Sequence, residues 1–148
     1  MSLDGVAERA IELEADQVVI VDRWRGGPGK INLFTIGSSG LKPFSPLMLI
    51  SGIRLRREFK EGTRRIRASA ITMEPEDSPE LGRIAGHLSQ FFCLPVLSVD
   101  EAAGKHGASM HLSFDSSRRP RITFVLLSRM VEIGPRIIFS KLVWEGST

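Results

Sequence analysis

The sequence lacks three features that would place it in a specialised class of protein. It has a single cysteine, Cys93, so it cannot form an internal disulfide framework, and a reducing compartment is expected. No apolar run approaches the roughly 20 residues needed to cross a bilayer, so no membrane partner is expected. The first residues, Met1-Ser2-Leu3-Asp4, have neither the cations nor the apolar run of a signal peptide. We therefore expect a cytoplasmic protein.

Constellations that would support catalysis or metal binding are also missing. The three histidines, His87, His106 and His111, do not stand at zinc-finger spacing from Cys93, and no Cys-x-x-Cys pair is present. We interpret the histidines as hydrogen-bonded or exposed, and Cys93, among apolar neighbours, as an inert buried thiol. The sequence predicts a protein without enzymatic activity, metal or cofactor.

What the chain does have is an ordinary globular composition with unevenly distributed charge. At 148 residues, with 42% hydrophobic and 25% charged residues, it is long enough for one domain with a real core. Residues 1–22 hold six acids and one base, whereas residues 54–67 hold seven bases and two acids. A second basic cluster comprises Arg118, Arg119 and Arg121. Arginine binds phosphate in a planar fork, so the clusters together favour an anionic partner, although each alone could be a solvated face.

A basic, glycine-rich segment separates two apolar runs near the amino terminus. It reads Asp22-Arg23-Trp24-Arg25-Gly26-Gly27-Pro28-Gly29-Lys30, and its flanks, 18–21 and 31–34, have the length and composition of strands. Cations, exposed amides and an aromatic ring suit a phosphate backbone with unstacked bases. The alternative is an ordinary basic hairpin loop with Trp24 folded over it. The segment is too short for a Walker loop and leads into a strand.

Local patterns predict helices and strands along the rest of the chain. Ser2 caps a helix that is apolar on one face and acidic on the other. The run 18–21 reads as a strand covered on both faces, and Pro43 and Pro46 precede a strand that continues to residue 55. The basic segment then forms a hairpin whose second strand ends at Met73, with its cations on the tip and the solvent face.

The second half repeats the order of a helix followed by strands. Residues 74–79 form a boundary, and Asp77 caps a helix in a capping box with Glu80. The expected buried stripe of this helix is Leu81, Ile84, Ala85, Leu88, Phe91 and Phe92. A short strand at 96–99 and a helical turn at 100–105 follow. The remaining expected strands are 109–114, 121–127 and 136–144, the last ending at Trp144, which packs in the core or at a sheet edge.

Two motifs resemble the Brix-domain proteins of the short archaeal type. The first is Glu14-Ala15-Asp16-Gln17-Val18-Val19-Ile20-Val21 followed by Arg25-Gly26-Gly27-Pro28-Gly29-Lys30-Ile31, with Gly27 in place of the family's usual asparagine. The second is Val131-Glu132-Ile133-Gly134-Pro135-Arg136-Ile137-Ile138-Phe139, which is similar to the family's carboxy-terminal Glu-x-Gly-Pro-Arg turn and last strand. The resemblance spans most of the chain.

This resemblance implies an α/β (α+β) fold, with residues 1–148 forming a single Brix-like domain of two related halves, approximately 1–75 and 76–148. Each half would be similar to the anticodon-binding domain of class II aminoacyl-tRNA synthetases. It also implies a role in ribosome biogenesis through ribosomal RNA or its precursor, alongside other assembly proteins. Family members usually begin with a Thr-Ser-Arg-x-Pro strand and a helix, which are absent ahead of Ser2. An exposed sheet edge or apolar face in the first half would favour self-association.

The sequence thus predicts a non-enzymatic RNA-binding factor in ribosomal RNA processing and subunit assembly. The expected RNA-binding residues are Arg23, Trp24, Arg25, Lys30, Arg54, Arg56, Arg57, Arg64, Arg65, Arg67 and Arg136. For Arg136 the alternative is a local ion pair with Glu132. The alternative function is a protein-interaction module within a ribonucleoprotein assembly, in which the acidic first helix docks a partner and the arginines only solubilise.

Overall fold

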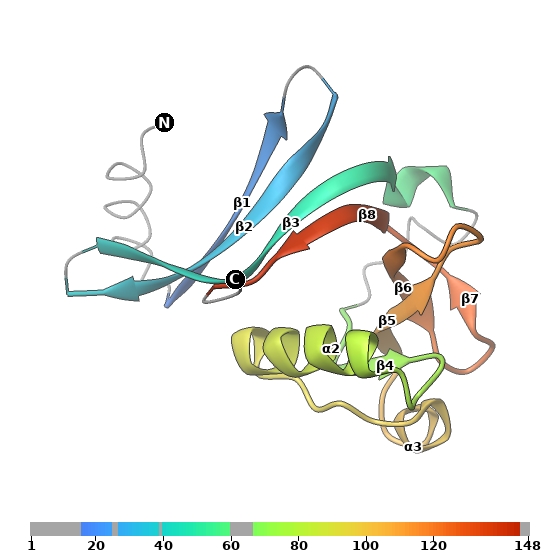
Figure 1. The fold of residues 1–148 in the computed structure, drawn as a ribbon. Helices are drawn as coiled ribbons and strands as arrows, with labels where there is room; N and C mark the ends of the chain where they lie inside the picture. Colours follow the sequence, from blue (N-terminus) through green and yellow to red (C-terminus); the bar gives the residue numbers. More distant parts are fainter. Residues whose placement is uncertain (1–15, 25–26, 39, 60–66, 146–148) are drawn as a thin grey trace. The chain divides into compact units, whose positions relative to one another are not determined.

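The computed structural model describes residues 16–24, 27–38, 40–59 and 67–145 (Figure 1). Their fold mixes α and β elements and is dominated by strands, in agreement with the expected class. The chain divides into two compact units: Met1–Leu49 with Lys141–Thr148 form unit 1, and Ile50–Ser140 form unit 2. The expected boundary near residue 76 lies inside unit 2. The two related halves, and their likeness to the anticodon-binding domain, stay predictions.

Unit 1 is built on an antiparallel hairpin, as the sequence predicts. Strands β1 (Gln17–Trp24) and β2 (Gly27–Gly37) pair so that Asp22 lies opposite Lys30. Strand β3 (Gly40–Arg54) pairs antiparallel with β2 and continues into unit 2. Gly40 follows the turn between them with φ of 109°, a conformation that favours glycine. The buried apolar side chains of these strands in unit 1 are Ile31, Leu33, Phe34, Pro46 and Met48.

Two expectations for unit 1 are wrong. The strand at 18–21 is not covered on both faces, because Val19 is 44% exposed and Val21 is 63% exposed. An apolar run indicates a strand but does not say whether that strand lies inside a sheet or at its edge. Pro43 and Pro46 lie within β3 instead of before it. The β2–β3 register shifts between Phe44 and Met48, around Pro46, and such irregularities are where a strand tolerates proline. Pro43 lies in regular register, opposite Phe34.

Unit 2 contains four strands in the order β8-β6-β5-β4, with the short β7 paired to β6. Strand β4 (Ala70–Met73) runs parallel to β5 (Ala108–Phe114), which is antiparallel to β6 (Pro120–Leu126). Strands β7 (Val131–Glu132) and β8 (Arg136–Val143) both pair antiparallel with β6. The expected strands at 109–114, 121–127 and 136–144 are confirmed to within one residue.

The expected basic hairpin is wrong. After Arg54 the chain enters a short 3-10 helix, η1 (Arg56–Glu58), and β4 pairs with β5 instead of with β3. Alternating apolar residues tell which face of a strand is buried, but they do not identify the strand beside it.

Helix α2 (Pro79–Phe92) connects β4 to the rest of unit 2 and buries the expected stripe, except for Phe92, which is 36% exposed. Its amino-terminal cap is Ser78 and not Asp77, because the Ser78 hydroxyl accepts a hydrogen bond from the Leu81 amide at 3.2 Å. Cys93 ends the helix with φ of 57° and is exposed, which corrects the expectation of a buried thiol.

The segment after α2 also differs from the expected one. Residues 96–99 form no strand beyond a single bridge between Val96 and Ile71, and the helical turn, α3 (Val99–Ala103), begins earlier than expected. The largest fully buried side chains of unit 2 include Ile71, Leu81, Phe91, Ile133 and Phe139. Among the described helices, none is long and apolar enough to cross a membrane. The expected helix after Ser2 lies outside the described residues.

Candidate nucleic-acid interface

Phe59 joins two arginines that are far apart in the sequence. It follows η1 and is only 8% exposed. The guanidinium carbon of Arg54 lies 4.3 Å from the centre of its ring, and that of Arg136 lies 5.4 Å away. Each cation is therefore within cation–π range of the same ring. The stack fixes the two guanidinium groups, while Arg54 remains exposed on the end of β3.

The turn at Gly134 is attached to the same segment by a hydrogen bond. Arg56 Nε donates to the Gly134 carbonyl oxygen at 3.0 Å, across 78 residues of sequence. Gly134 has φ of 67°, and the side of the residue that would carry a Cβ faces the ring of Phe59. The Gly-Pro-Arg motif and the basic segment, which are separate motifs in the sequence, thus contact each other in the structure.

The 3-10 helix η1 holds this segment in place through its own hydrogen bonds. The Leu55 amide donates to Glu58 Oε2 at 2.6 Å, and Arg54 donates to the Glu58 carbonyl oxygen at 3.0 Å. Arg54 thereby uses one N–H of the five that a guanidinium carries. Among the described residues no other group accepts a hydrogen bond from Arg54, so its other donors can serve an external acceptor such as a phosphate.

Arg136 is held by Glu132, as the alternative interpretation of this residue expects. Arg136 Nε donates to Glu132 Oε2 at 2.7 Å, its terminal nitrogen bonds the other carboxylate oxygen, and Thr123 donates to Oε2 at 2.6 Å. Burial raises the pKa of Glu132, but the hydrogen bonds from Arg136 and Thr123 outweigh it and leave that pKa below its usual value. The hydrogen bond with Glu132 in turn raises the pKa of Arg136. Much of the charge of Arg136 is therefore balanced inside unit 2.

A second group of arginines lies on the turn between β5 and β6. Arg119 donates to Ser51 Oγ at 3.2 Å and forms an ion pair of 2.9 Å with Asp115. Ser51 stands three residues before Arg54 on β3, so Arg119 lies beside the strand that carries Arg54. Arg118 is exposed and lies 5.6 Å from the ring of Phe114.

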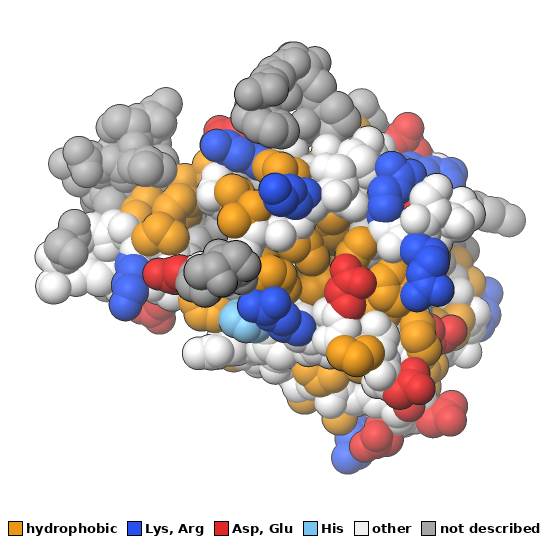
Figure 2. Space-filling model, viewed as in Figure 1, with side chains coloured by type: hydrophobic (Ala, Val, Ile, Leu, Met, Phe, Trp, Pro, Cys, Tyr) orange, Lys and Arg blue, Asp and Glu red, His pale blue; other side chains and the backbone are white. Residues whose placement is uncertain are grey.

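Five arginines therefore gather in unit 2 around the end of β3 and the Gly134 turn. We call them the arginine surface: Arg54, Arg56, Arg118, Arg119 and Arg136. In Figure 2, Lys and Arg side chains gather at the upper right, over the region where Figure 1 places η1 and the start of β8. The basic cluster at 118–121 is evident in the sequence but is not among the predicted binding residues, because nothing local places that turn beside β3.

The remaining predicted residues are placed only in part. Arg25, Arg64 and Arg65 lie outside the described residues, and the side chains of Arg23, Trp24 and Arg57 do as well. Lys30 is half-buried on β2, opposite Asp22, and Arg67 is exposed just before β4. Their binding roles stay predictions.

One polar cluster in unit 2 has the atoms of a hydroxyl–imidazole–carboxylate arrangement. Thr72 Oγ1 lies 2.7 Å from His111 Nδ1, and His111 Nε2 lies 3.8 Å from a Glu74 carboxylate oxygen. Thr72 is fully buried, however, so no substrate can reach its hydroxyl in this structure. Within the described part of the chain, no group of three or more His, Cys, Asp and Glu side chains could hold a metal ion.

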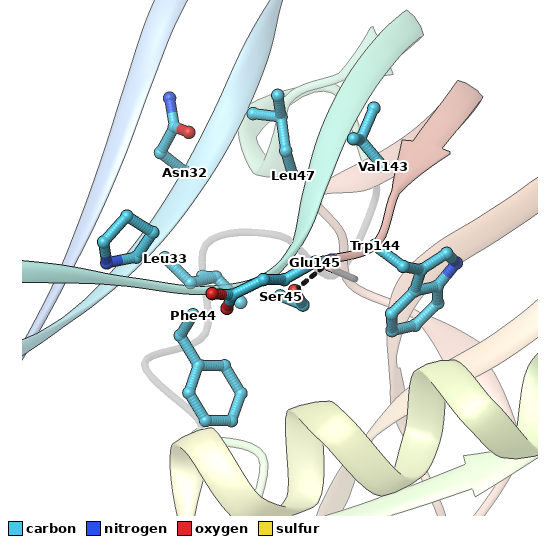
Figure 3. A pocket seen from close by; sticks show the side chains of 9 residues that line it. Asn32, Leu33, Phe44, Ser45, Leu47, Val143, Trp144 and Glu145 are labelled. Carbon is cyan, nitrogen blue, oxygen red and sulfur yellow. Dashed lines mark hydrogen bonds between the residues drawn. The ribbon is translucent and has the colours of Figure 1, made fainter. Parts of the chain in front are cut away.

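Unit 1 contains a cavity of about 320 Å³, shown in Figure 3. Two of the segments that line it are joined by a hydrogen bond, in which the Glu145 amide donates to Ser45 Oγ at 2.7 Å. In Figure 3 the side chains of Leu47 and Val143 extend to one side of the strands, and those of Phe44 and Trp144 to the other. The lining side chains thus do not converge on one ligand position, and the arginine surface is the stronger candidate site.

Comparison with known proteins identifies the fold. The structure is similar to the crystal structure of a probable ribosomal biogenesis protein from Aeropyrum pernix K1, with a TM-score of 0.71 and 20% sequence identity over 97% of this chain and 79% of that one. It is also similar to Mil, an archaeal Imp4-like protein, with a TM-score of 0.55 and 14% identity over 96% of this chain and 76% of that one. No protein-family model matches the chain, and no curated protein matches its sequence. At these identities, the similarity shows a shared fold.

Proposed function

We propose that the protein is a non-catalytic ribosome-biogenesis factor that binds structured ribosomal RNA, or its precursor, through the arginine surface of unit 2. The observation that carries the proposal is that two exposed arginines from different parts of the chain lie along β3: Arg54 at its end, and Arg119, which donates to Ser51 of the same strand. The fold similarity to a probable ribosomal biogenesis protein and to an Imp4-like protein supports the same function.

The chemistry of the arginine surface suits RNA phosphate. Arg54 is exposed and has N–H donors for which no described residue is the acceptor. The side chain of Arg119 is 45% exposed. Guanidinium groups bind phosphate oxygens in a bidentate manner and stack on unpaired bases. Because Phe59 and Asp115 restrain Arg54 and Arg119, less side-chain entropy is lost on binding. A structured RNA presents closely spaced phosphates that such a surface can contact together.

The proposal is tested by charge reversal with a matched control. The variant Arg54→Glu with Arg118→Glu removes two exposed cations from the arginine surface. The control, Arg129→Glu with Lys105→Glu, makes the same change in charge at two exposed residues outside the arginine surface. Arg129 follows the carboxyl end of β6, whereas Arg118 and Arg119 precede its amino end. A mobility-shift assay with a structured ribosomal RNA fragment measures binding.

We expect the wild type to bind at about 50 mM salt and to weaken steeply by about 200 mM, since phosphate contacts release counterions. The surface variant should bind about tenfold or more weakly at low salt, and the control should change much less. Equal losses in both variants would mean that only net charge matters. Absence of wild-type binding at low salt would overturn the proposal in favour of the protein-interaction module.

A further inference from the structure

Strand β1 is an end strand of the sheet. It pairs with β2 on one side, and no other described strand pairs with its second side. An end strand presents unpaired N–H and C=O groups that can pair with another strand. Proteins usually protect such an edge with lysine, proline or a very short strand. Residues 17–22 contain neither lysine nor proline, and β1 is eight residues long.

The same strand exposes apolar side chains next to that edge. Val21 is 63% exposed and Val19 is 44% exposed, and both lie on one face because strand side chains alternate. These valines flank Ile20, which is half-buried on the other face. An occupant of this edge must therefore supply both a strand backbone and apolar side chains.

A second copy of β1 fits these requirements because the strand is complementary to itself. The tripeptide Val19-Ile20-Val21 reads the same in both directions. In a continuous antiparallel sheet, residues directly opposite each other point to the same face. A two-fold axis that relates two copies of one strand must therefore pass through a residue, and that residue lies opposite its own copy. With the axis at Ile20, Val19 of one copy lies opposite Val21 of the other, and the four valines form one apolar cluster.

The side chains that would lie opposite each other disfavour the two neighbouring registers. With the axis at Val19, Asp16 would lie directly opposite Asp22 of the second copy, and like charges in that position are destabilising. With the axis at Val21, Val19 would lie opposite Arg23 of the second copy, so Val19 would leave the apolar cluster. The register centred on Ile20 places no acid directly opposite another acid. Within its own chain, Asp22 remains opposite Lys30 in the β1–β2 pair.

We infer that the protein forms a two-fold dimer in which β1 pairs antiparallel with β1 of a second copy, with Ile20 on the axis. This dimer extends the sheet of unit 1 across two chains. It uses residues separate from the arginine surface, so it does not depend on the proposed RNA binding.

Symmetric cysteine cross-linking tests the register. In a Cys93→Ser background, Ile20→Cys places the thiol of one protomer directly opposite the same thiol of its partner. Their Cα atoms would be about 4.5–5.5 Å apart, a separation that a disulfide can span. The control, Val21→Cys, places each thiol opposite Val19 and diagonal to its copy. Under a mild oxidant, Ile20→Cys should form a disulfide-linked dimer at least tenfold faster than Val21→Cys. Equal rates, or no cross-linking of Ile20→Cys, would overturn the register.

Sedimentation equilibrium tests the dimer itself. The wild type should shift from 16.4 kDa towards twice that mass as its concentration rises. Val21→Lys places a charge in the apolar cluster and should weaken dimerisation at least tenfold, whereas Val143→Lys, at another exposed valine of unit 1, should not. The variant Arg54→Glu with Arg118→Glu should dimerise as the wild type does. A wild type that stays monomeric at its highest soluble concentration, or a Val21→Lys variant that dimerises equally well, would overturn the inference.

Discussion

The ring of Phe59 occupies the space that a side chain on Gly134 would need. A Cβ atom on Gly134 would lie 2.5 Å from Cδ2 of Phe59 and closer still to Cε2. Gly134 also has φ of 67°, which is costly for residues that carry a Cβ. The glycine of the Gly-Pro-Arg motif is therefore required by the packing of η1 against the turn.

Substituting Gly134 by alanine should lower the free energy of unfolding by about 2–4 kcal/mol. About 1–2 kcal/mol comes from the left-handed backbone, and the rest from displacing the Phe59 ring. Thermal or urea unfolding measures the loss. Gly52→Ala is the control, because a Cβ on this residue would meet no other atom within 4 Å and its φ is not positive; its stability should be unchanged or slightly higher. Equal stability of both variants would contradict the packing described for Gly134.

The buried imidazole of His111 should make stability depend on pH. Burial lowers the pKa of His111 from its ordinary value of 6.5, and the cation of Arg121 adds to this, while Glu74 acts in the opposite direction. The fold therefore favours the neutral imidazole. Its contribution to stability is complete above pH 6.5 and is lost as the pH falls from there towards the lower pKa of the folded state. Each unit of pKa difference corresponds to about 1.4 kcal/mol.

Urea unfolding between pH 5 and pH 8 measures this dependence. The wild type should lose stability below about pH 6.5, and His111→Gln should flatten the curve in that range. His106→Gln is the matched control, because it removes a more exposed imidazole, which is hydrogen-bonded to Ser69 at 2.7 Å. A curve for His111→Gln that follows the wild type would refute the assignment to His111.

Glu132 is expected to restrain RNA binding while it stabilises the fold. Its carboxylate neutralises Arg136 and accepts a hydrogen bond from the buried hydroxyl of Thr123. Glu132→Gln should lower the free energy of unfolding by about 1–2 kcal/mol, because a charged acceptor becomes a neutral one. It should also raise RNA affinity about two- to fivefold at low salt, because the charge of Arg136 is no longer balanced.

Thr123→Val separates the two effects. This variant removes the hydroxyl and lowers stability, but it leaves the Arg136–Glu132 pair intact, so RNA affinity should not change. Mobility shifts at two salt concentrations and urea unfolding provide both readouts. Glu132→Gln with unchanged affinity would show that Arg136 makes no contribution to RNA binding.

Local patterns predicted individual elements well, because each depends on neighbouring residues. The β1–β2 hairpin follows from two apolar runs around a glycine-rich tip, and the strands at 108–114 and 120–126 follow from their composition. The partner of β4 did not follow, since Ala70–Met73 pairs in parallel with a strand nearly 40 residues later. Pairing of that kind depends on the path of the chain, which the alternation of side chains does not encode.

In the candidate site, too, the local motifs could be predicted from the sequence, but the contacts between them could not. The basic segment and the Gly-Pro-Arg motif were visible in the sequence, but their contact through Phe59, Arg56 and Gly134 joins residues about 75 positions apart. Phe59 carried no local signal, because a single aromatic residue in a basic segment can equally be exposed. The Arg136–Glu132 pair could be anticipated, since it spans four residues.

At the cap of α2 the sequence pattern and the structure point to different residues. The pattern Asp77-x-x-Glu80 predicts a cap at Asp77, whereas the Ser78 hydroxyl accepts the hydrogen bond from the Leu81 amide and Pro79 takes the first helical position. Ser78→Ala should therefore lower the free energy of unfolding by about 1 kcal/mol. Asp77→Ala removes an exposed side chain just before the cap and should change stability by less than about 0.5 kcal/mol. Urea unfolding of the two variants distinguishes the two assignments. If Asp77→Ala lowers the free energy of unfolding more than Ser78→Ala does, the cap residue is Asp77.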